Sequence, residues 1–191
     1  NVTTTDDQGN QVTTITTTDQ YGNASDYLCG DVLPDFYGGF GTSFQWKGLD
    51  LSVDFQYQIG GLVYDSSYQQ LMGLSRGQAM HVDQLAAWST ENPNSNIPRI
   101  QYKDDATASS SDRFLTNASY LTLSNITLGY TFPALMKCGT HEYFAGRVYF
   151  TVQNPFIITK YKGLDPEVAN GVDKDPYPRP VSFQLGVHFD F

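Results

Sequence analysis

The residue types that usually carry chemistry are present in this sequence but are not spaced for it. The three histidines, His81, His141 and His188, are scattered and have no partners at a metal-ligand spacing. The one Gly-x-Ser-x-Gly string, from Gly73 to Gly77, lies inside a helix-compatible stretch and not at the strand-to-helix turn that presents a serine as a nucleophile. The Asp-Lys-Asp stretch at 173–175 resembles part of a calcium loop, but the later ligands and the central glycine are missing. We therefore predict a chain that is not an enzyme and holds no cofactor, and leave open only calcium in acidic loops.

The carboxylates of Asp50 and Asp54 are the nearest approach to a catalytic pair, because both fall on one face of a predicted strand. Paired carboxylates can act together as general acid and general base. The same face, however, also carries Ser52, Gln56 and Gln58, so that a polar wall accounts for the two residues without catalysis. We interpret Asp50 and Asp54 as residues of such a wall.

The balance of charge excludes further classes of partner. The chain has 191 residues, with 11 Lys and Arg against 20 Asp and Glu, and a formal net charge of −9. A protein that binds nucleic acid needs a basic stripe to neutralise phosphates, and the sequence has none. It also has no run of about 18 apolar residues, the length of a transmembrane helix. We therefore predict neither a nucleic-acid partner nor a helical membrane span.

Alternation of apolar and polar residues is the strongest pattern in the sequence. Between Leu49 and Ile59 the odd positions are all apolar and the even positions all polar, and residues 181–191 repeat the pattern. A strand points successive side chains to opposite faces, so each segment has one apolar and one polar face. Three other segments show the same alternation in part. We predict strands over about 36–46, 49–60, 114–132, 146–158 and 181–191.

Three properties of these strands favour a membrane barrel over a soluble sandwich. The clean runs are eleven residues long, which suits a tilted membrane strand. Their apolar faces continue to both ends and finish in aromatics such as Trp46, Tyr57 and Phe191, as interfacial girdles do. Their polar faces carry mainly uncharged residues, which suits a wet lumen. The predicted fold class is an all-β antiparallel transmembrane barrel, and a soluble β-sandwich that binds glycans is the alternative.

The lengths of the connections predict the topology. Bacterial outer-membrane barrels have short periplasmic turns and long extracellular loops. Here the Lys47-Gly48 turn and the segment 133–145 are short, whereas 60–113 and 160–180 are long, so that short and long connections alternate. We assign 1–35 to an extracellular loop and hairpin region and 36–191 to the barrel. Five strands cannot close without leaving backbone groups unpaired in lipid, so we expect a larger barrel.

Two loop segments have local patterns of their own. Residues 66–88 have helix-compatible content, which Gly73 and Gly77 weaken. Residues 2–5 and 12–18 flank a polar turn and predict a Thr-rich hairpin.

Four segments form recognisable motifs: Trp46–Ser52, Asn117–Pro133, Gly163–Val168, and Tyr177-Pro178-Arg179 followed by an alternating strand to Phe191. They resemble the C-terminal end of the SusC/RagA family of TonB-dependent transporters, which belong to Bacteroidetes outer membranes. The resemblance covers about residues 33–191, and a Thr at 122 replaces the Arg or Lys that the family has there, which we interpret as a surface change.

The resemblance implies a whole protein much larger than this chain. It would be a barrel of about 22 strands with an N-terminal plug, on which TonB pulls. It would import oligosaccharides or peptides with a SusD-like surface lipoprotein as its lid, in the outer membrane of a Gram-negative, Bacteroidetes-like bacterium. Neither the plug nor the TonB-contacting segment lies within this chain. Its own partners would be the rest of the barrel polypeptide, the lid, the cargo and outer-membrane lipid.

Three sets of residues are candidate functional positions. The resemblance gives Phe191, with Phe189, the role of a terminal signal for barrel assembly. The polar strand faces predict the lumen-facing residues Asp50, Asp54, Gln56, Gln184 and His188. Aromatic rings stack on sugars and peptides, so loop aromatics are candidate cargo contacts, with packing of the loops as the other interpretation. They are Trp88, Tyr64, Tyr68, Tyr102 and Tyr161.

Overall fold

The chain divides into two compact units. A computed structural model describes residues 2–18, 20–73, 77–101, 108–132, 136–138, 141–143, 145–168, 170–174 and 177–190. One unit, the sheet unit, comprises Asp31–Tyr64 and Leu115–Phe191, and the other, the loop unit, comprises Asn1–Gly30 and Asp65–Phe114. Among the described residues, no helix is both long and apolar enough to cross a membrane.

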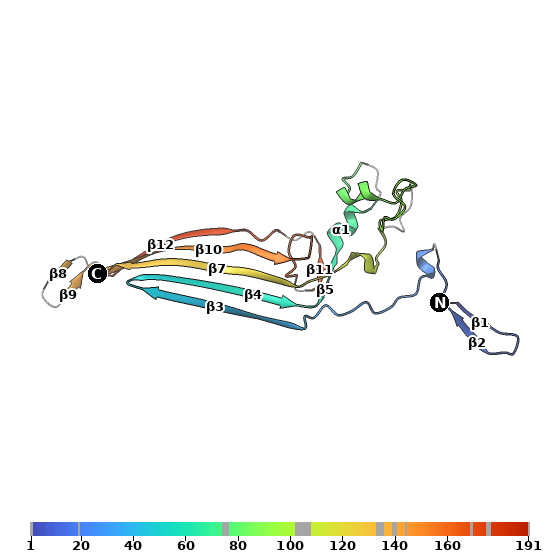
Figure 1. Ribbon diagram of the computed structural model, residues 1–191, viewed down its shortest axis with the longest axis horizontal. Helices are drawn as coiled ribbons and strands as arrows, with labels where there is room; N and C mark the ends of the chain where they lie inside the picture. The colour runs from blue at the N-terminus through green and yellow to red at the C-terminus, as the bar shows by residue number, and fades with distance from the viewer. Residues whose placement is uncertain are drawn as a thin grey trace. The chain divides into compact units, whose positions relative to one another are not determined.

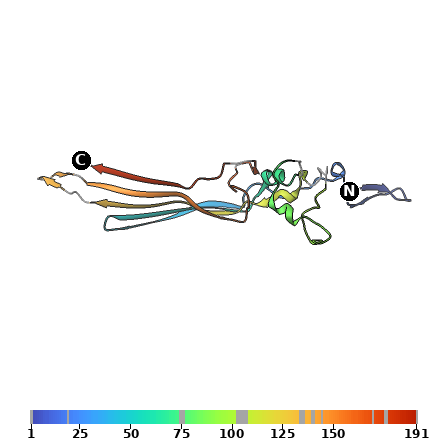
Figure 2. The same ribbon diagram turned by 90° about the horizontal axis from the view of Figure 1, so that it is seen from above.

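The sheet unit is built on five antiparallel strands in the order β12-β10-β7-β4-β3, so that strands adjacent in this series are neighbours in the sheet. Figure 1 shows them side by side, and Figure 2 shows their curvature and twist. The two long connections, after β4 and β10, leave from one end of the sheet, and the two shorter ones from the other. The strands are β3 (Phe36–Trp46), β4 (Leu49–Ile59), β7 (Tyr120–Phe132), β10 (Ala145–Thr159) and β12 (Ser182–Asp190).

The register gathers the apolar side chains on one face, called here the apolar face. Leu51 of β4 pairs with Leu128 of β7, which in turn pairs with Phe150 of β10. Phe150 pairs with Leu185 of β12, so one apolar row crosses four strands. Large side chains on this face are open to solvent, and Leu185 is 75% exposed. A β-sandwich would cover such a face with a second sheet.

The opposite, polar face follows from the same register. Ser52 of β4 pairs with Thr127 of β7, and Thr127 pairs with Thr151 of β10. Thr151 pairs with Gln184 of β12. The alternation read from the sequence therefore becomes two continuous surfaces of opposite character.

A line of bulges crosses the sheet and changes the phase of the alternation in β7. Ser124 has no partner on β4, where Asp54 and Phe55 pair with the residues on either side of it. On β10 the two residues Asn154 and Pro155 lie opposite Ser124. Asn154 has a positive φ of 52°, which fits a bulge. Because of the bulge, the residues of β7 on the apolar face have odd numbers before Ser124 and even numbers after it.

The predicted strand over 114–132 is wrong in one respect, because two strands replace it. β6 (Leu115–Asn117) pairs with β5 (Leu62–Asp65) in a small sheet that also contains β11 (Val172–Asp173). The break follows from local hydrogen bonds: the Ser119 N–H donates to Asn117 Oδ1 at 2.9 Å, and the Ala118 N–H donates to the Gly61 carbonyl at 3.0 Å. Val63, Ala118 and Tyr161 form a buried cluster here, against which Val168 packs.

The other four predicted strands match the structure to within one residue at each described end. The shorter connection between β7 and β10 contains β8 (Met136–Cys138) paired with β9 (His141–Tyr143).

The loop unit is mostly irregular. Within the described residues of the helix-compatible stretch 66–88, the helices are α1 (Ser66–Leu71) and the 3₁₀ helix η2 (Val82–Ala86), and α1 ends just before Gly73. The predicted hairpin is present as β1 (Val2–Thr5) and β2 (Gln11–Thr14). Two further 3₁₀ helices are η1 (Tyr21–Asn23) and η4 (Asp112–Phe114).

Two tyrosines join the separate chain segments of the loop unit. The Tyr21 hydroxyl donates to the Ser110 carbonyl at 2.7 Å, and the Tyr27 hydroxyl donates to the Asp112 carboxylate. The hydrogen bond to Asp112, followed by the charge of that carboxylate, raises the pKa of Tyr27 to about 12.

The turn between β3 and β4 requires its glycine. Lys47 and Gly48 both have positive φ, at 48° and 85°, as the two central residues of a type I′ hairpin do. The Gly48 carbonyl accepts a hydrogen bond of 2.7 Å from the Thr131 N–H, so the turn is also joined to β7. A Cβ on Gly48 would lie 2.5 Å from the Thr131 carbonyl oxygen.

We predict that Gly48→Ala destabilises the full-length receptor by about 1–2 kcal/mol or more, because a left-handed backbone and a backbone contact both oppose the methyl group. Gly22→Ala is the matched control, since nothing lies within 4 Å of its Cβ position. The free energy of unfolding is measured by denaturant titration of receptor folded in lipid vesicles. Equal stability of the two variants would contradict the assigned turn.

Candidate functional site

An ion pair on the polar face crosses a whole strand. Arg147 of β10 binds Asp50 of β4 through two contacts, Nη2 to Oδ2 at 2.5 Å and Nε to Oδ1 at 3.2 Å. Both strands neighbour β7, so the pair passes over Gly129 of β7. A Cβ on Gly129 would lie 2.6 Å from the Arg147 guanidinium and from both Asp50 oxygens. Glycine at position 129 therefore gives the pair its space.

An aromatic ring continues this arrangement to β12. The Arg147 guanidinium lies 5.2 Å from the centroid of the Tyr149 ring, within cation–π range. Gly186 of β12 pairs with Tyr149, and a Cβ on Gly186 would collide with the Tyr149 ring. The side chains of Asp50, Arg147 and Tyr149 thus span four strands. They come from β4 and β10, and they lie over β7 and β12 at Gly129 and Gly186, where the lack of a side chain leaves space.

A second polar row lies beside the bulges. Asn125 Nδ2 donates to Asp54 Oδ2 at 3.4 Å and to Thr127 Oγ1 at 3.3 Å. The hydroxyls of Thr127 and Thr151 share a hydrogen bond of 2.8 Å. Asp54 is therefore part of a hydrogen-bonded polar wall, in agreement with the interpretation that neither it nor Asp50 needs a catalytic role.

The structure places all five predicted lumen-facing residues on the polar face. Asp50 and Asp54 lie there in the contacts just described. Gln56 pairs with Thr122, Gln184 with Thr151 and His188 with Arg147, and directly paired residues share a face.

The candidate cargo aromatics are divided between the two units. Tyr161 of the sheet unit is only 5% exposed, and its hydroxyl donates to the buried carboxylate of Asp173, so its ring packs the loop between β10 and β12. Tyr64 lies in β5, in the same unit, and is half-buried. Tyr68 and Trp88 belong to the loop unit, and Tyr102 lies outside the described residues.

Within the loop unit, Tyr68 is part of a packed cluster, whereas Trp88 is 41% exposed. The Tyr68 hydroxyl donates to Asp83 Oδ2 at 3.1 Å, and its ring meets His81 edge-on at a centroid distance of 4.7 Å. Burial, and after it the hydrogen bond to Asp83, raises the pKa of Tyr68. Of these aromatics, Trp88 therefore has the larger open surface.

The two candidate residues of the assembly signal lie at the end of β12. Phe189 is 53% exposed, and its ring lies 6.3 Å from that of Phe132 on β7. Phe191 lies outside the described residues. The assembly role of both residues stays a prediction.

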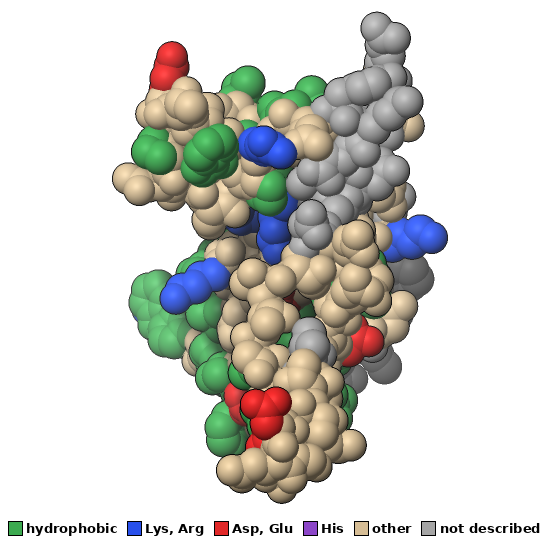
Figure 3. Space-filling model, turned by 90° about the vertical axis from the view of Figure 1, so that its right-hand side faces the viewer, with side chains coloured by type: hydrophobic (Ala, Val, Ile, Leu, Met, Phe, Trp, Pro, Cys, Tyr) green, Lys and Arg blue, Asp and Glu red, His purple; other side chains and the backbone are tan. Residues whose placement is uncertain are grey.

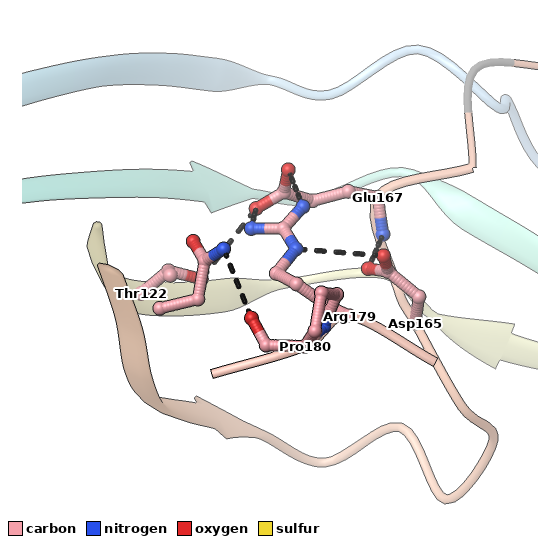
Figure 4. Close-up of polar contacts among 6 residues, drawn as sticks. Thr122, Asp165, Glu167, Arg179 and Pro180 are labelled. Carbon is pink, nitrogen blue, oxygen red and sulfur yellow. Dashed lines mark hydrogen bonds and ion pairs between the residues drawn. The ribbon is translucent and has the colours of Figure 1, made fainter. Parts of the chain in front are cut away.

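A cluster of charges that was not predicted from the sequence lies in the loop between β10 and β12. Arg179 binds the Glu167 carboxylate through two nitrogens, one of them Nη1 at 2.9 Å from Oε1, and its Nε lies 3.6 Å from Asp165 Oδ2. Figure 4 shows these three residues, called here the Arg179 clasp, together with Thr122. The hydrogen bond to Glu167 raises the pKa of Arg179, which keeps its charge at any physiological pH.

Members of the clasp come from two of the family-like motifs, Gly163–Val168 and Tyr177–Arg179. The signal in the sequence is that the two motifs carry opposite charges. Because the loop has no periodic pattern, the spacing of these residues does not predict that they pair. Thr122, which Glu167 contacts, is 1% exposed, so the interpretation of its replacement as a surface change is wrong.

The described residues bring no three His, Cys, Asp or Glu side chains together as a metal site requires. Calcium binding in acidic loops, which the sequence leaves open, stays untested. Figure 3 shows separate Lys and Arg side chains among hydrophobic and other side chains on the face in view.

A meandering antiparallel sheet with one exposed apolar face, one polar face and alternating long and short connections is typical of a transmembrane β-barrel wall. The sequence comparisons agree. The chain is 40% identical over 162 residues to the TonB-dependent receptor SusC of Bacteroides thetaiotaomicron, covering 85% of the chain and 15% of that receptor. It is 31% identical over 180 residues to the TonB-dependent receptor P3 of Formosa agariphila, covering 86% and 17%. No family model matches the chain.

The solved structures point the same way. The RagAB peptide importer in its closed-closed state matches with a TM-score of 0.74 and 29% identity, covering 98% of this chain and 20% of that one. Its open-open state matches with a TM-score of 0.76 and 28% identity, covering 93% and 19%.

The chain belongs to the SusC/RagA family of TonB-dependent receptors and forms part of a larger barrel. It spans 15–17% of the length of the curated relatives named above. The family confirms the predicted barrel over the soluble sandwich. Its members here are receptors and importers rather than enzymes, which confirms that prediction as well.

We predict that Asp50 and Arg147 stabilise the barrel cooperatively, with a coupling of about 0.5–1 kcal/mol for this partly exposed pair. The measurement is a double-mutant cycle with Asp50→Asn and Arg147→Gln, read as free energies of unfolding of the full-length receptor in lipid vesicles. Gly129→Ala should remove the coupling, since its methyl group occupies the space of the pair. A coupling that survives Gly129→Ala would refute this geometry.

Proposed function

We propose that this chain is a section of the wall of an outer-membrane importer, with the apolar face toward lipid and the polar face toward the lumen. The observation that carries the proposal is the two-faced five-stranded sheet in a chain that belongs to a family of TonB-dependent receptors. An apolar row across four strands requires contact with hydrocarbon, and a hydrogen-bonded polar face requires contact with water. The wall defines the passage, and the long loops meet the outside.

The cargo and the partners belong to the whole receptor, of which this chain is a part. The importer takes up oligosaccharides or peptides. The similarity to the RagAB peptide importer supports peptides as cargo, and the similarity to SusC supports membership of the SusC/RagA family. A SusD-like surface lipoprotein covers the long loops as a lid. TonB supplies energy through a plug segment elsewhere in the polypeptide. The location is the outer membrane of a Gram-negative, Bacteroidetes-like bacterium.

Deletion of the gene for the full-length receptor tests this function. We predict that the deletion strain loses growth on one class of nutrient, either oligosaccharide or peptide mixtures supplied as the sole source, and that the full-length gene restores it. Uptake of radiolabelled nutrient is the direct measurement. The matched control is a full-length gene without its TonB-contacting segment, which should reach the membrane in equal amount but restore no uptake.

Two outcomes would contradict the proposal. Unchanged uptake of every nutrient in the deletion strain would remove the import function. Full restoration by the gene without the TonB-contacting segment would indicate a passive pore in place of an energised importer.

A further inference from the structure

The loop between β10 and β12 contacts the polar face of the sheet near the end at which β7 begins. Thr122 pairs with Gln56 of β4, whereas its neighbours Leu121 and Leu123 pair with Tyr57 and Phe55 of the apolar face. The side chain of Thr122 therefore points to the polar side. It lies two residues inside β7, or about 7 Å from the start of the strand at roughly 3.3 Å per residue.

Glu167 of this loop covers Thr122. The Thr122 hydroxyl donates to Glu167 Oε1 at 3.5 Å, and Thr122 is only 1% exposed although the strands on either side leave this face open at other positions. Figure 4 shows the Glu167 carboxylate and the Arg179 guanidinium facing each other, with Thr122 of β7 beside them. The loop is thus folded over the polar face at this end of the sheet.

Both arms of the loop are attached at this position. On the first arm, Asp165 Oδ1 accepts a hydrogen bond of 2.9 Å from the Glu167 N–H, and Pro166 between them is buried. On the second arm, Asn154 at the bulge of β10 donates to the Pro180 carbonyl at 3.5 Å. The Arg179 clasp joins the two arms through charge-assisted hydrogen bonds, which are stronger than neutral ones.

The clasp leaves two large apolar side chains beside it in the open. Leu164, which precedes Asp165, is 56% exposed, and Tyr177, two residues before Arg179, is 84% exposed. The charged groups of the clasp satisfy one another, so the free surface of the loop is aliphatic and aromatic at these positions. Such a pair suits the apolar side chains of a peptide, which is the cargo of the solved importer that the chain resembles.

We infer that this loop is a fixed rim that narrows the mouth of the lumen, that the Arg179 clasp holds it there, and that Leu164 and Tyr177 contact the cargo. The position of the rim rests on the barrel wall alone, and the cargo contact rests on the proposed import function. Tyr161 was predicted from the sequence as a candidate cargo contact. In the structure its buried ring packs the base of the same loop.

Accessibility of a cysteine at position 122 tests the seated rim. The full-length receptor, purified in detergent with Cys29 and Cys138 replaced by serine, carries Thr122→Cys and reacts with a bulky charged maleimide. We predict that Thr122→Cys reacts about tenfold more slowly than a Lys162→Cys reporter on the exposed part of the loop. Addition of Arg179→Met should raise the rate at position 122 about tenfold, because the cover is released.

Lys174→Met is the matched control, since it removes an exposed cation of the same loop outside the clasp and should leave the rate at position 122 unchanged. Rapid labelling at position 122 in the parent would overturn the inward fold. Slow labelling that persists with Arg179→Met would overturn the role of the clasp. These labelling rates need no transport, so they test whether the loop covers Thr122 even where the proposed function fails.

Uptake of a labelled peptide mixture by cells that express the variants tests the cargo contact. We predict that Tyr177→Ala lowers uptake about fivefold through lost stacking area, at equal surface amount and with position 122 still protected. Lys174→Ala serves as the control and should leave uptake unchanged. Uptake that is unaffected by both Tyr177→Ala and Leu164→Ala would overturn the contact, as would a receptor that imports nothing.

Discussion

Backbone hydrogen bonding in hydrocarbon is the constraint on which the rest of this structure depends. Within lipid an N–H or C=O group has no water to bind, and each one left unpaired costs several kcal/mol. The chain meets this constraint with five strands that pair in sequence order, so every inner strand has a neighbour on both sides. The one proline within these strands, Pro155, lies in a bulge, where its missing N–H is tolerated. The outer edges of β3 and β12 require strands from the remainder of the barrel.

Once the backbone is paired, the side chains differ mainly by face. The apolar face needs no specific contacts, because lipid accepts any apolar shape. The polar face instead carries a network in which glycines act as spaces: the Asp50–Arg147 pair passes over Gly129, and the Tyr149 ring lies over Gly186. The same face receives the Arg179 clasp near one end. The polar face therefore carries both the ion pair that crosses the strands and the contacts of the loop between β10 and β12.

The sequence predicts the parts of the fold that have a period. The run from Phe36 to Trp46 is a strand with those same limits, because nothing interrupts its alternation. The break at Ala118 and Ser119 was not predicted, since an Asn117 side chain and a distant Gly61 carbonyl decide it. The clasp was missed for the same reason: Glu167 and Arg179 are brought together by a non-periodic loop. Periodicity reports which face a residue takes, and it does not report contacts made by loops.

In the proposed function the two faces of the sheet meet lipid and water respectively. Spin labels at successive positions of β4, from Leu51 to Asp54, in the full-length receptor reconstituted into lipid bilayers would distinguish the two faces. Accessibility to oxygen, which concentrates in lipid, should be high at positions 51 and 53 and low at 52 and 54. Accessibility to a water-soluble nickel chelate should show the opposite alternation. Equal access of the nickel chelate to all four positions would contradict this orientation of the faces.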